Sequence, residues 1–528
     1  MPEISPRLLK IWLRALPVMF AGIAAGSSGA FAQISGAPIE RAARTAGAEA
    51  ADAASPADSS VFRVEHESRH QGVFHGQTVA YRAVVERFSL QLDRGPAGDV
   101  VATSYIASPT GSGRHGRPEP SDRPVIFLFN GGPISPSVYL HMLAFGPKRL
   151  AVAADLTADP KTFPVVDNTE TVLDQADLVF YDPVGTGFSR PASGNRVEAF
   201  FSVERDAREL TQFVLAWSRA HGRLNAPKFL FGESYGTIRA AVAARQLAEL
   251  PTPVRLDGVF LMGQALNIIE TVGRPANVMS YVVSLPTLAA LGWYHGKVAP
   301  QGRSFEAFLD EVRQFSTREY LPALLQGSLI EPADLHRVAS RLEALTGLPA
   351  ARFEQLGLRV SKPRYRQELL ADRGLVLGAN DGRYAAAAKP GQDPSGVYLP
   401  RISEAFDQYR RRTLGVPERL GTYVVDSPVD SLDAWNWGNT QPFGDWAYME
   451  DLRVAMQKLP GLRLVIGTGY HDTLTTVGAA EQALAQSGWP RDRVSMRYYQ
   501  GGHMAYTIDA SLAALMNDVR ALVAPPSR

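Results

Sequence analysis

The sequence predicts an α/β fold with a mostly parallel central β-sheet and helices on both of its faces. Short, continuous apolar runs, typical of strands buried on both faces, occupy residues 125–129, 178–181, 229–231 and 258–262. Helical patterns separate these runs, as at residues 201–221, and strands that alternate with helices pair in parallel. Ahead of them, residues 77–106 alternate in the manner of antiparallel strands. Together these patterns predict one sheet with an antiparallel start.

A long helical stretch interrupts the strand pattern. The pattern stops after Asn267, residues 271–400 read as mostly helical, and strands return only at residues 464–466 and 494–499. Because the late strands need the early ones as sheet neighbours, one interrupted core is favoured over two independent domains. The predicted units are a core of residues 61–270 and 401–528 and a helical insertion, or cap, at residues 271–400. Near the end of this insertion, residues 381–384 are predicted to form a surface turn, with a position facing the cleft as the alternative.

The N-terminal residues are typical of an export signal. A positive region with Arg7, Lys10 and Arg14 precedes a mostly small and apolar stretch, and an Ala-x-Ala site ends at Ala32. This pattern predicts a signal peptide at residues 1–32, cleaved after Ala32, and a periplasmic or secreted protein. The alternative is an uncleaved membrane anchor, which the shortness of the apolar run disfavours.

Composition excludes several classes of function. The 528 residues carry a formal net charge of +1, so no electrostatic footprint for nucleic acid is present. The absence of cysteine excludes disulfides, thiolate zinc sites and cysteine nucleophiles. Residues 33–60 are rich in Ala, Ser and Gly and predict a flexible leader. No other apolar run is long enough to span a membrane, so no integral span is expected after signal cleavage.

Residues 232–236 read Gly-Glu-Ser-Tyr-Gly and lie between an apolar run and a helical pattern. An apolar strand that enters Gly-x-Ser-x-Gly and continues as a helix is the sequence form of a nucleophile elbow. The turn is so tight that side chains two residues before and after the serine would clash, which explains the glycines. The interpretation makes Ser234 a nucleophile, and an ordinary glycine-rich turn is the alternative.

An acid and a base follow in the order that such a nucleophile requires. Asp472 follows the strand at residues 464–466, and His503 follows the last predicted strand. The acid and the base of this kind of site lie in loops after late strands. Of the four histidines after Ser234, two fall in the helical insertion and His471 precedes its own candidate acid, so His503 is the best base. Taken singly, each residue could be an ordinary loop residue.

The segment at residues 130–133, Asn-Gly-Gly-Pro, directly follows the predicted strand at residues 125–129. An oxyanion hole needs two backbone N–H groups that point at the developing negative charge. The residue after the nucleophile, Tyr235, would supply one of them, and this glycine-rich loop would supply the other. Glycine allows the main chain to approach a substrate closely. A structural turn is the alternative for this segment.

Four motifs in this order resemble the serine carboxypeptidase family. They are Phe-Asn-Gly-Gly-Pro at 129–133, Tyr-Asp-Pro-Val-Gly-Thr-Gly-Phe-Ser at 181–189, Gly-Glu-Ser-Tyr-Gly at 232–236 and Gly-His-Met at 502–504. The similarity runs from about residue 77 to the C-terminus. It implies an α/β-hydrolase with a helical insertion, which agrees with the break after Asn267.

The resemblance implies a role for each matching residue. Ser234 would be the nucleophile, His503 the general base and acid, and Asp472 the group that orients the imidazole. The amides of Gly132 and Tyr235 would form the oxyanion hole. Substrate binding would fall to Asn130, Gly131 and Glu233, of which Asn130 and Glu233 match the residues that bind a free C-terminal carboxylate. Glu233 can do so only when protonated, and the family provides a partner glutamate that shares a proton and favours activity at acid pH.

The chain departs from the family pattern around this carboxylate site. Residues 142–147 read Met-Leu-Ala-Phe-Gly-Pro and offer no carboxylate where the partner glutamate would stand. Leu128 stands where the family usually carries a tryptophan, and all family disulfides are absent. These differences leave Ser234, Asp472 and His503 in place and bear on recognition of a free C-terminus.

The sequence therefore predicts a serine-type carboxypeptidase that hydrolyses C-terminal peptide bonds through an acyl-enzyme. Its partner would be a peptide substrate, with no nucleic acid, no cofactor and no metal. An esterase or acyltransferase on the same fold is the alternative, because the same three residues serve any acyl transfer. A catalytically silent binding protein that keeps the fold is a third reading, which the intact Ser234, Asp472 and His503 disfavour.

Overall fold

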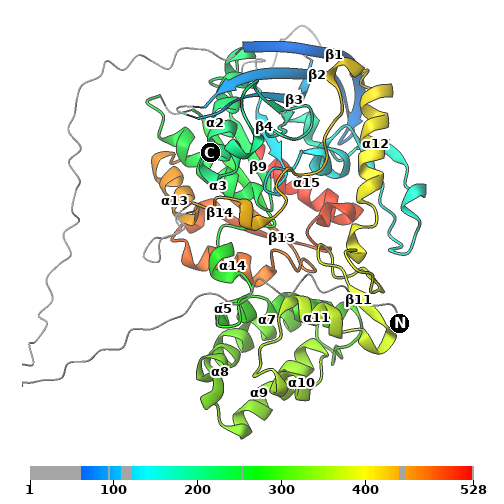
Figure 1. Ribbon diagram of the computed structural model, residues 1–528, viewed down its shortest axis with the longest axis vertical. Helices are drawn as coiled ribbons and strands as arrows, with labels where there is room; N and C mark the ends of the chain where they lie inside the picture. The colour runs from blue at the N-terminus through cyan, green and yellow to red at the C-terminus, as the bar shows by residue number, and fades with distance from the viewer. Residues whose placement is uncertain (1–60, 93–94, 109–121, 253, 439–447, 526–528) are drawn as a thin grey trace, which may run out of the picture. The chain divides into compact units, whose positions relative to one another are not determined.

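The computed structural model describes residues 61–525 except for residues 93–94, 109–121, 253 and 439–447 (Figure 1). The predicted signal peptide at residues 1–32 and the predicted leader at residues 33–60 lie outside the described residues. No helix in the described part of the chain has both the length and the apolar character needed to cross a membrane.

Within the described residues, one ten-stranded sheet has the order β1-β2-β3-β7-β4-β9-β10-β13-β14, with β8 paired to β3. The strands are β1 (Val61–Phe74), β2 (Gln77–Gln91), β3 (Ala97–Ala107), β4 (Val125–Phe129), β7 (Asp177–Phe180), β8 (Arg190–Pro191), β9 (Lys228–Glu233), β10 (Leu256–Met262), β13 (Arg463–Gly469) and β14 (Val494–Tyr499). Pairing is antiparallel from β1 to β7 and parallel from β7 to β14. The predicted parallel sheet with an antiparallel start is confirmed.

Side chains alternate along the central strands between two hydrophobic cores, one on each face of the sheet. Phe127 and Phe129 of β4 face one core, and Ile126 and Leu128 face the other. Every residue of β4 is buried, which explains its continuous apolar run. The covering helices are α2 (Val203–Ala220), α3 (Gly236–Ala248) and α13 (Tyr448–Lys458) over the first core, and α12 (Leu399–Arg412) and α15 (Asp509–Val523) over the second (Figure 1).

The sequence analysis missed β1, whose residues alternate without a clear apolar face. Its sequence includes Arg63, Glu65, Glu67 and Arg69, so polarity hides the strand pattern. The strand forms because it pairs with β2 over nearly its whole length. The Arg87 guanidinium of β2 also binds the Glu65 carboxylate at 2.7 Å. Tertiary pairing, rather than local hydrophobic pattern, therefore creates this edge strand.

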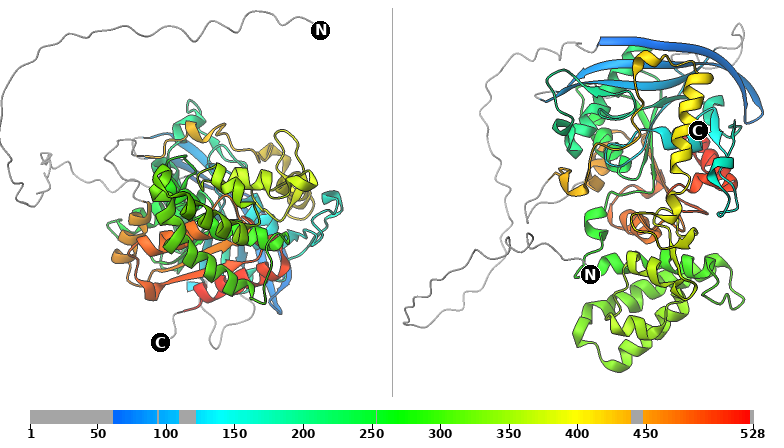
Figure 2. Two further views of the ribbon diagram at one scale, coloured as in Figure 1. Left: turned by 90° about the horizontal axis from the view of Figure 1, so that it is seen from below. Right: turned by 45° about the vertical axis from the view of Figure 1, so that its right-hand side comes forward.

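Residues 268–398 build a layer of helices with a hydrophobic core of its own (Figure 2). Its helices are α4 (Ile268–Thr271), α5 (Val278–Val282), α6 (Leu285–Tyr294), α7 (Phe305–Phe315), α8 (Leu321–Gln326), α9 (Pro332–Thr346), α10 (Ala350–Gln355) and α11 (Lys362–Glu368). A short hairpin, β11 (Leu375–Leu377) and β12 (Ala385–Ala387), adds strands where the sequence indicated helices. The helical layer contacts the core at α14 (Val477–Gln486). The hydroxyl of Thr476, which precedes this helix, donates to the Val283 carbonyl at 2.9 Å.

The remaining regular elements connect the strands of the core. They include α1 (Val138–Leu140), a π-helical turn (His141–Phe145), the hairpin of β5 (Lys148–Leu150) and β6 (Val165–Asp167), and several short 3-10 helices.

Replacement of Trp217 is expected to destabilise the core of the sheet strongly. The Trp217 indole is fully buried, packs edge-on against Phe127 and donates to the Ser104 hydroxyl at 3.0 Å. Trp217→Ala should lower the free energy of unfolding by about 3–5 kcal/mol in urea denaturation. Leu329→Ala is the matched control, because Leu329 is 83% exposed and should change stability little. Equal stability of the two variants would contradict this packing.

Candidate active site

Ser234 occupies a strained turn between β9 and α3. Its backbone φ is 59°, a left-handed conformation that residues with side chains rarely adopt. The Ser234 N–H donates to the Met262 carbonyl at 2.9 Å, so β10 holds the turn in place. A Cβ at Gly232 would lie 2.3 Å from the Gly236 carbonyl oxygen. Only glycine fits at that position, which agrees with the reason inferred for the glycines of a nucleophile elbow.

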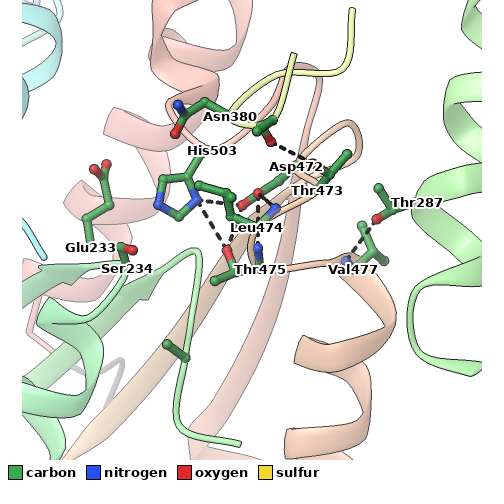
Figure 3. A network of polar contacts seen from close by, with 12 residues as sticks. Glu233, Ser234, Thr287, Asn380, Asp472, Thr473, Leu474, Thr475, Val477 and His503 are labelled. Atoms are coloured by element: carbon green, nitrogen blue, oxygen red, sulfur yellow. Dashed lines mark hydrogen bonds and ion pairs between the residues drawn. The ribbon is translucent and has the colours of Figure 1, made fainter. Parts of the chain in front are cut away.

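Asp472 and His503 meet at the ends of β13 and β14 (Figure 3). Asp472 Oδ2 lies 2.7 Å from His503 Nδ1. The other carboxylate oxygen accepts the Leu474 N–H at 2.7 Å and the Thr475 N–H at 3.0 Å. Because an ionised carboxylate only accepts hydrogen bonds, the His503 proton belongs on Nδ1. The opposite edge of the ring faces Ser234 and Glu233 (Figure 3), as a base that removes the serine proton requires.

The environment of His503 favours its charged form. Burial lowers the pKa of His503, but the charge and hydrogen bond of Asp472 and the charge of Glu233 outweigh burial and raise it to about 9. These charges favour the imidazolium over the neutral ring in the free protein. Since a general base must be neutral, activity that depends on His503 alone should increase as pH rises through this pKa.

The insertion also contributes to the position of His503. The backbone N–H of His503 donates to the Asn380 carbonyl at 2.6 Å. The backbone N–H of Gly382 donates to the His471 carbonyl at 3.0 Å. The prediction of a surface turn at residues 381–384 is wrong, because Asp381 and Tyr384 are buried. The local sequence is turn-like, but the segment lies against the loop of His503 and loses its exposure there.

The glycine-rich loop after β4 lies directly on the Ser234 turn. A Cβ at Gly131 would lie 2.6 Å from the Tyr235 amide nitrogen and 2.8 Å from Ser234 Cβ. Gly132 has a φ of 107°, which favours glycine. In the described structure, neither the Gly132 N–H nor the Tyr235 N–H donates to a protein acceptor. Two unpaired backbone donors beside a serine hydroxyl are what stabilisation of an oxyanion requires.

Glu233 lies buried beside Ser234 with both carboxylate oxygens occupied. Oε1 accepts the Asn130 side-chain amide at 2.8 Å, and Oε2 accepts the Tyr506 hydroxyl at 2.5 Å. Burial raises the pKa of Glu233, and the charge of His503 and these two donors oppose the increase. Residues 142–147, where the sequence led us to expect a partner of Glu233, hold none, and Tyr506 binds it instead. The only sign of Tyr506 in the sequence is its position three residues after His503.

A buried arginine on the helix that follows Ser234 forms an ion pair with Asp206 and also binds the loop after β4. Arg239 is fully buried, and its Nε donates to Asp206 Oδ2 at 2.7 Å. Its Nη1 donates to the Asn130 carbonyl at 2.9 Å, and the Tyr235 hydroxyl donates to the same Asp206 oxygen at 2.9 Å. Arg239 therefore holds the glycine-rich loop against the elbow. In the sequence Arg239 is one of many arginines in helical patterns, so nothing there marks it as part of the site.

Metal ligands do not cluster in the described part of the chain. No group of three or more His, Asp or Glu side chains there could hold a metal ion. Three sets of polar groups lie near Ser234. They are the Asp472–His503 pair, the N–H groups of Gly132 and Tyr235, and the Glu233 carboxyl.

The strand order and the elbow define an α/β-hydrolase. The family model of the serine carboxypeptidases matches residues 114–262, which include the loop after β4 and the Ser234 turn. The resemblance seen in the sequence is thereby confirmed over this segment, which is less than half of the chain. No curated protein matches the chain.

Several solved structures show distant similarity. A putative hydrolase from Agrobacterium vitis S4 is 12% identical, with a TM-score of 0.30, and the match covers 83% of this chain and 99% of that one. The rice cell wall degrading esterase LipA from Xanthomonas oryzae is 11% identical, with a TM-score of 0.34 and coverage of 87% and 97%. The peroxisomal α/β-hydrolase Lpx1 from Saccharomyces cerevisiae is 8% identical, with a TM-score of 0.33 and coverage of 88% and 91%. The fold assignment rests on the strand order of this chain rather than on these matches.

Gly131→Ala is expected to impair catalysis by separating the loop after β4 from the elbow. The added methyl group would contact the Tyr235 amide and Ser234 Cβ. Hydrolysis of an activated ester should lose about 100-fold or more in kcat, as when one oxyanion donor is removed. Gly461→Ala is the matched control, since its added methyl group meets nothing within 4 Å. Retention of activity by Gly131→Ala would show that the close approach is unnecessary.

Proposed function

We propose that this protein is a serine-type carboxypeptidase that hydrolyses C-terminal peptide bonds through an acyl-enzyme. One observation carries the proposal: the Asp472–His503 pair and the Glu233 carboxyl, which accepts from the Asn130 amide, both lie beside Ser234. The first pair supplies acyl-transfer chemistry. The second supplies hydrogen-bonding groups for the free end of a peptide chain.

The reaction follows from the positions of these groups. Neutral His503 takes the proton of the Ser234 hydroxyl as Ser234 Oγ attacks the last peptide carbonyl. The N–H groups of Gly132 and Tyr235 bind the oxyanion of the tetrahedral intermediate. His503 then returns the proton to the departing amine, and the C-terminal residue leaves. A water molecule activated by His503 hydrolyses the acyl-enzyme and regenerates Ser234.

Recognition of the C-terminal carboxylate would fall to Asn130 and Glu233. The Asn130 side-chain amide donates to Glu233 Oε1 at 2.8 Å and so fixes the position of the carboxyl that would meet the substrate. A protonated Glu233 can donate to the carboxylate, whereas an ionised one would repel it. Burial, which raises the pKa of Glu233, supports the protonated form. Gly131 has no side chain, so the substrate can approach the main chain closely at the same place.

An esterase or acyltransferase activity is the second candidate. The Tyr506 contact favours it, because a hydroxyl that donates to Glu233 stabilises the ionised carboxylate. An ionised Glu233 would disfavour a free C-terminus and would tolerate a neutral ester or amide. A catalytically silent binding protein is the third candidate, which labelling of Ser234 by an organophosphonate would exclude.

Substrates that differ only at the C-terminus test the proposal. A blocked dipeptide with a free C-terminal acid should be hydrolysed at least tenfold faster, in kcat/KM, than its amide. The reason is that only the acid can accept hydrogen bonds from both Asn130 and protonated Glu233 with a charged carboxylate. One such charge-assisted hydrogen bond increases affinity about tenfold. Equal turnover of acid and amide would contradict the proposal and favour the second candidate. The ester of the same dipeptide reports acyl transfer independently of the C-terminus.

Ser234→Ala should remove hydrolysis of the acid, the amide and the ester together. Loss of the nucleophile leaves a residual rate at least about 10³-fold lower. Ser193→Ala is the matched control, because Ser193 is exposed and should leave all three rates unchanged. Residual activity in Ser234→Ala close to that of the wild type would contradict the assignment of the nucleophile.

We also propose that the chain is exported and cleaved after Ala32. The basic residues, the apolar stretch and the Ala-x-Ala site at its N-terminus support this proposal. N-terminal sequencing of the protein from a periplasmic or culture-medium fraction should begin at Gln33. Recovery of the uncleaved chain in the cell membrane would contradict it.

A further inference from the structure

A cavity of about 480 Å³ lies in the helical insertion, apart from the Ser234 site. It is lined by α11, by the β11–β12 hairpin region and by the loop that follows this hairpin, and α11 and β11 are neighbours in Figure 1. Its lining includes none of Ser234, Asp472 and His503. Cavities of this size are typical of sites for small organic molecules. The insertion therefore has room for a ligand outside the catalytic centre.

Apolar side chains form one part of the cavity wall. They are contributed by Val376 and Leu377 of β11, by Pro363 of α11 and by Pro394 of the following loop. Leu377 belongs to the hydrophobic core of the insertion, which fixes this part of the wall. Apolar surface that a ligand buries against such a wall leaves water with a gain in free energy. The wall therefore favours a ligand with an apolar body.

Arg366 of α11 is the charged group that distinguishes this cavity. It is partly buried and lines the cavity. Its Nη1 donates to the Thr473 hydroxyl at 2.8 Å, whereas its Nε and Nη2 donate to no acceptor among the described residues. Asp393 influences its charge without forming an ion pair with it. Because a partly desolvated guanidinium is stabilised by an anion, its unused edge is a binding group for one.

The second arginine of α11 shows the contrast. Arg364 pairs with Glu368 one turn along the helix at 3.0 Å. Glu368 also pairs with Arg352 of α10 at 2.6 Å. The carboxylate of this helix is thus used by two other arginines, and Arg366 is left to interact with something outside the helix.

Two further charged residues line the cavity. Lys389 is exposed and adds a second positive charge. Asp393 adds a negative charge, but its two oxygens accept the Ala379 N–H, and Oδ1 also accepts the N–H and the hydroxyl of Ser395. The lining therefore carries two positive charges and one negative charge that is already hydrogen-bonded to its own loop. This balance favours an anion over a cation.

We propose that this cavity binds a small carboxylic acid with an apolar body. The carboxylate would accept from Nε and Nη2 of Arg366, because these N–H groups share one edge of the guanidinium and match two carboxylate oxygens. The body would lie against Val376 and Leu377. This site goes beyond the proposed function and does not depend on it, since the lining contains no residue assigned to hydrolysis.

The same guanidinium connects the cavity to the catalytic loop. Arg366 holds the hydroxyl of Thr473, the residue after Asp472. This hydroxyl donates in turn to the carbonyl of Ala379, which also lines the cavity, at 2.7 Å. A bound carboxylate would therefore lie one side chain away from the loop of Asp472 without contacting Ser234.

Titration calorimetry of the full chain with phenylbutyrate tests the site. Phenylbutyrate combines a carboxylate with a phenyl group, and a ligand of about 12 non-hydrogen atoms binds in the millimolar range or tighter. Phenylbutanamide has the same shape without the charge and should bind about tenfold more weakly or worse. Inorganic phosphate lacks the apolar body and should be similarly weak. Absence of phenylbutyrate binding at about 10 mM, or equal affinity for phenylbutyrate and either comparison compound, would overturn the proposal.

Substitutions on α11 test the role of the guanidinium. Arg366→Gln should weaken phenylbutyrate binding about tenfold or more, because a charge-assisted pair of hydrogen bonds is lost. Arg366→Lys keeps the charge but loses the planar edge, so its affinity should lie between those of the wild type and Arg366→Gln. Arg364→Gln is the matched control, since Arg364 lies on the same helix and outside the lining, and it should leave the affinity unchanged.

Ala388→Trp keeps the test independent of the contact between Arg366 and Thr473. Ala388 is exposed and lines the cavity, so a larger side chain there should occupy the cavity without disturbing a core. Loss of phenylbutyrate binding in both Ala388→Trp and Arg366→Gln would support the proposal. Binding that persists in Ala388→Trp, together with competitive inhibition of ester hydrolysis, would place the carboxylate at Ser234 and overturn it. Persistence without inhibition would place it elsewhere and overturn the proposal equally.

Discussion

The left-handed turn at Ser234 is the constraint on which the rest of the site depends. A residue with a side chain at φ 59° is strained, so neighbouring structure must hold it there. The Met262 carbonyl of β10 accepts the Ser234 N–H, and the loop after β4 lies so close that only glycine fits at position 131. Arg239 completes this support through the Asn130 carbonyl and Asp206. The parallel order of β4, β9 and β10 brings these groups to one edge of the sheet.

Around this turn, electrostatics rather than geometry alone determines what the site can do. Asp472 accepts four hydrogen bonds, from His503, Leu474 and twice from Thr475, and its carboxyl lies next to the His503 ring. Glu233 is a second buried carboxyl, held by Asn130 and Tyr506 instead of by another acid. The pKa of His503 therefore depends on two carboxyl groups, Asp472 and Glu233. This difference in environment is what the proposed roles require, orientation of the imidazole by Asp472 and recognition by Glu233.

The insertion is part of the site rather than only a cover over it. Its segment at residues 380–384 packs on the loop of His503, and the Asn380 carbonyl accepts the backbone N–H of His503. On α11, Arg366 donates to the Thr473 hydroxyl at 2.8 Å, and Lys362 donates to the Leu474 carbonyl. The loop that carries Asp472 is thus held from the side of the insertion. Substitutions in α11 can therefore alter catalysis without contacting a substrate.

The sequence by itself determined the features that local chemistry and chain order encode. Apolar runs predicted the buried parallel strands, because strands covered on both faces need no polar side. The order of Ser234, Asp472 and His503 predicted loops at one edge of the sheet, and the structure brings the last two within 2.7 Å. Glycine spacing predicted the tight turn, since no other residue avoids the clash at position 232.

Only the tertiary structure decided the features that depend on distant neighbours. The polar strand β1 exists because β2 pairs with it, and residues 381–384 are buried because the loop of His503 lies against them. Arg239 and Tyr506 look ordinary in the sequence. Their roles arise from partners that are 33 and 273 residues away in the chain, Asp206 and Glu233. The ionisation of a buried group depends on which charges and donors surround it in space, and the order of residues along the chain does not specify that environment.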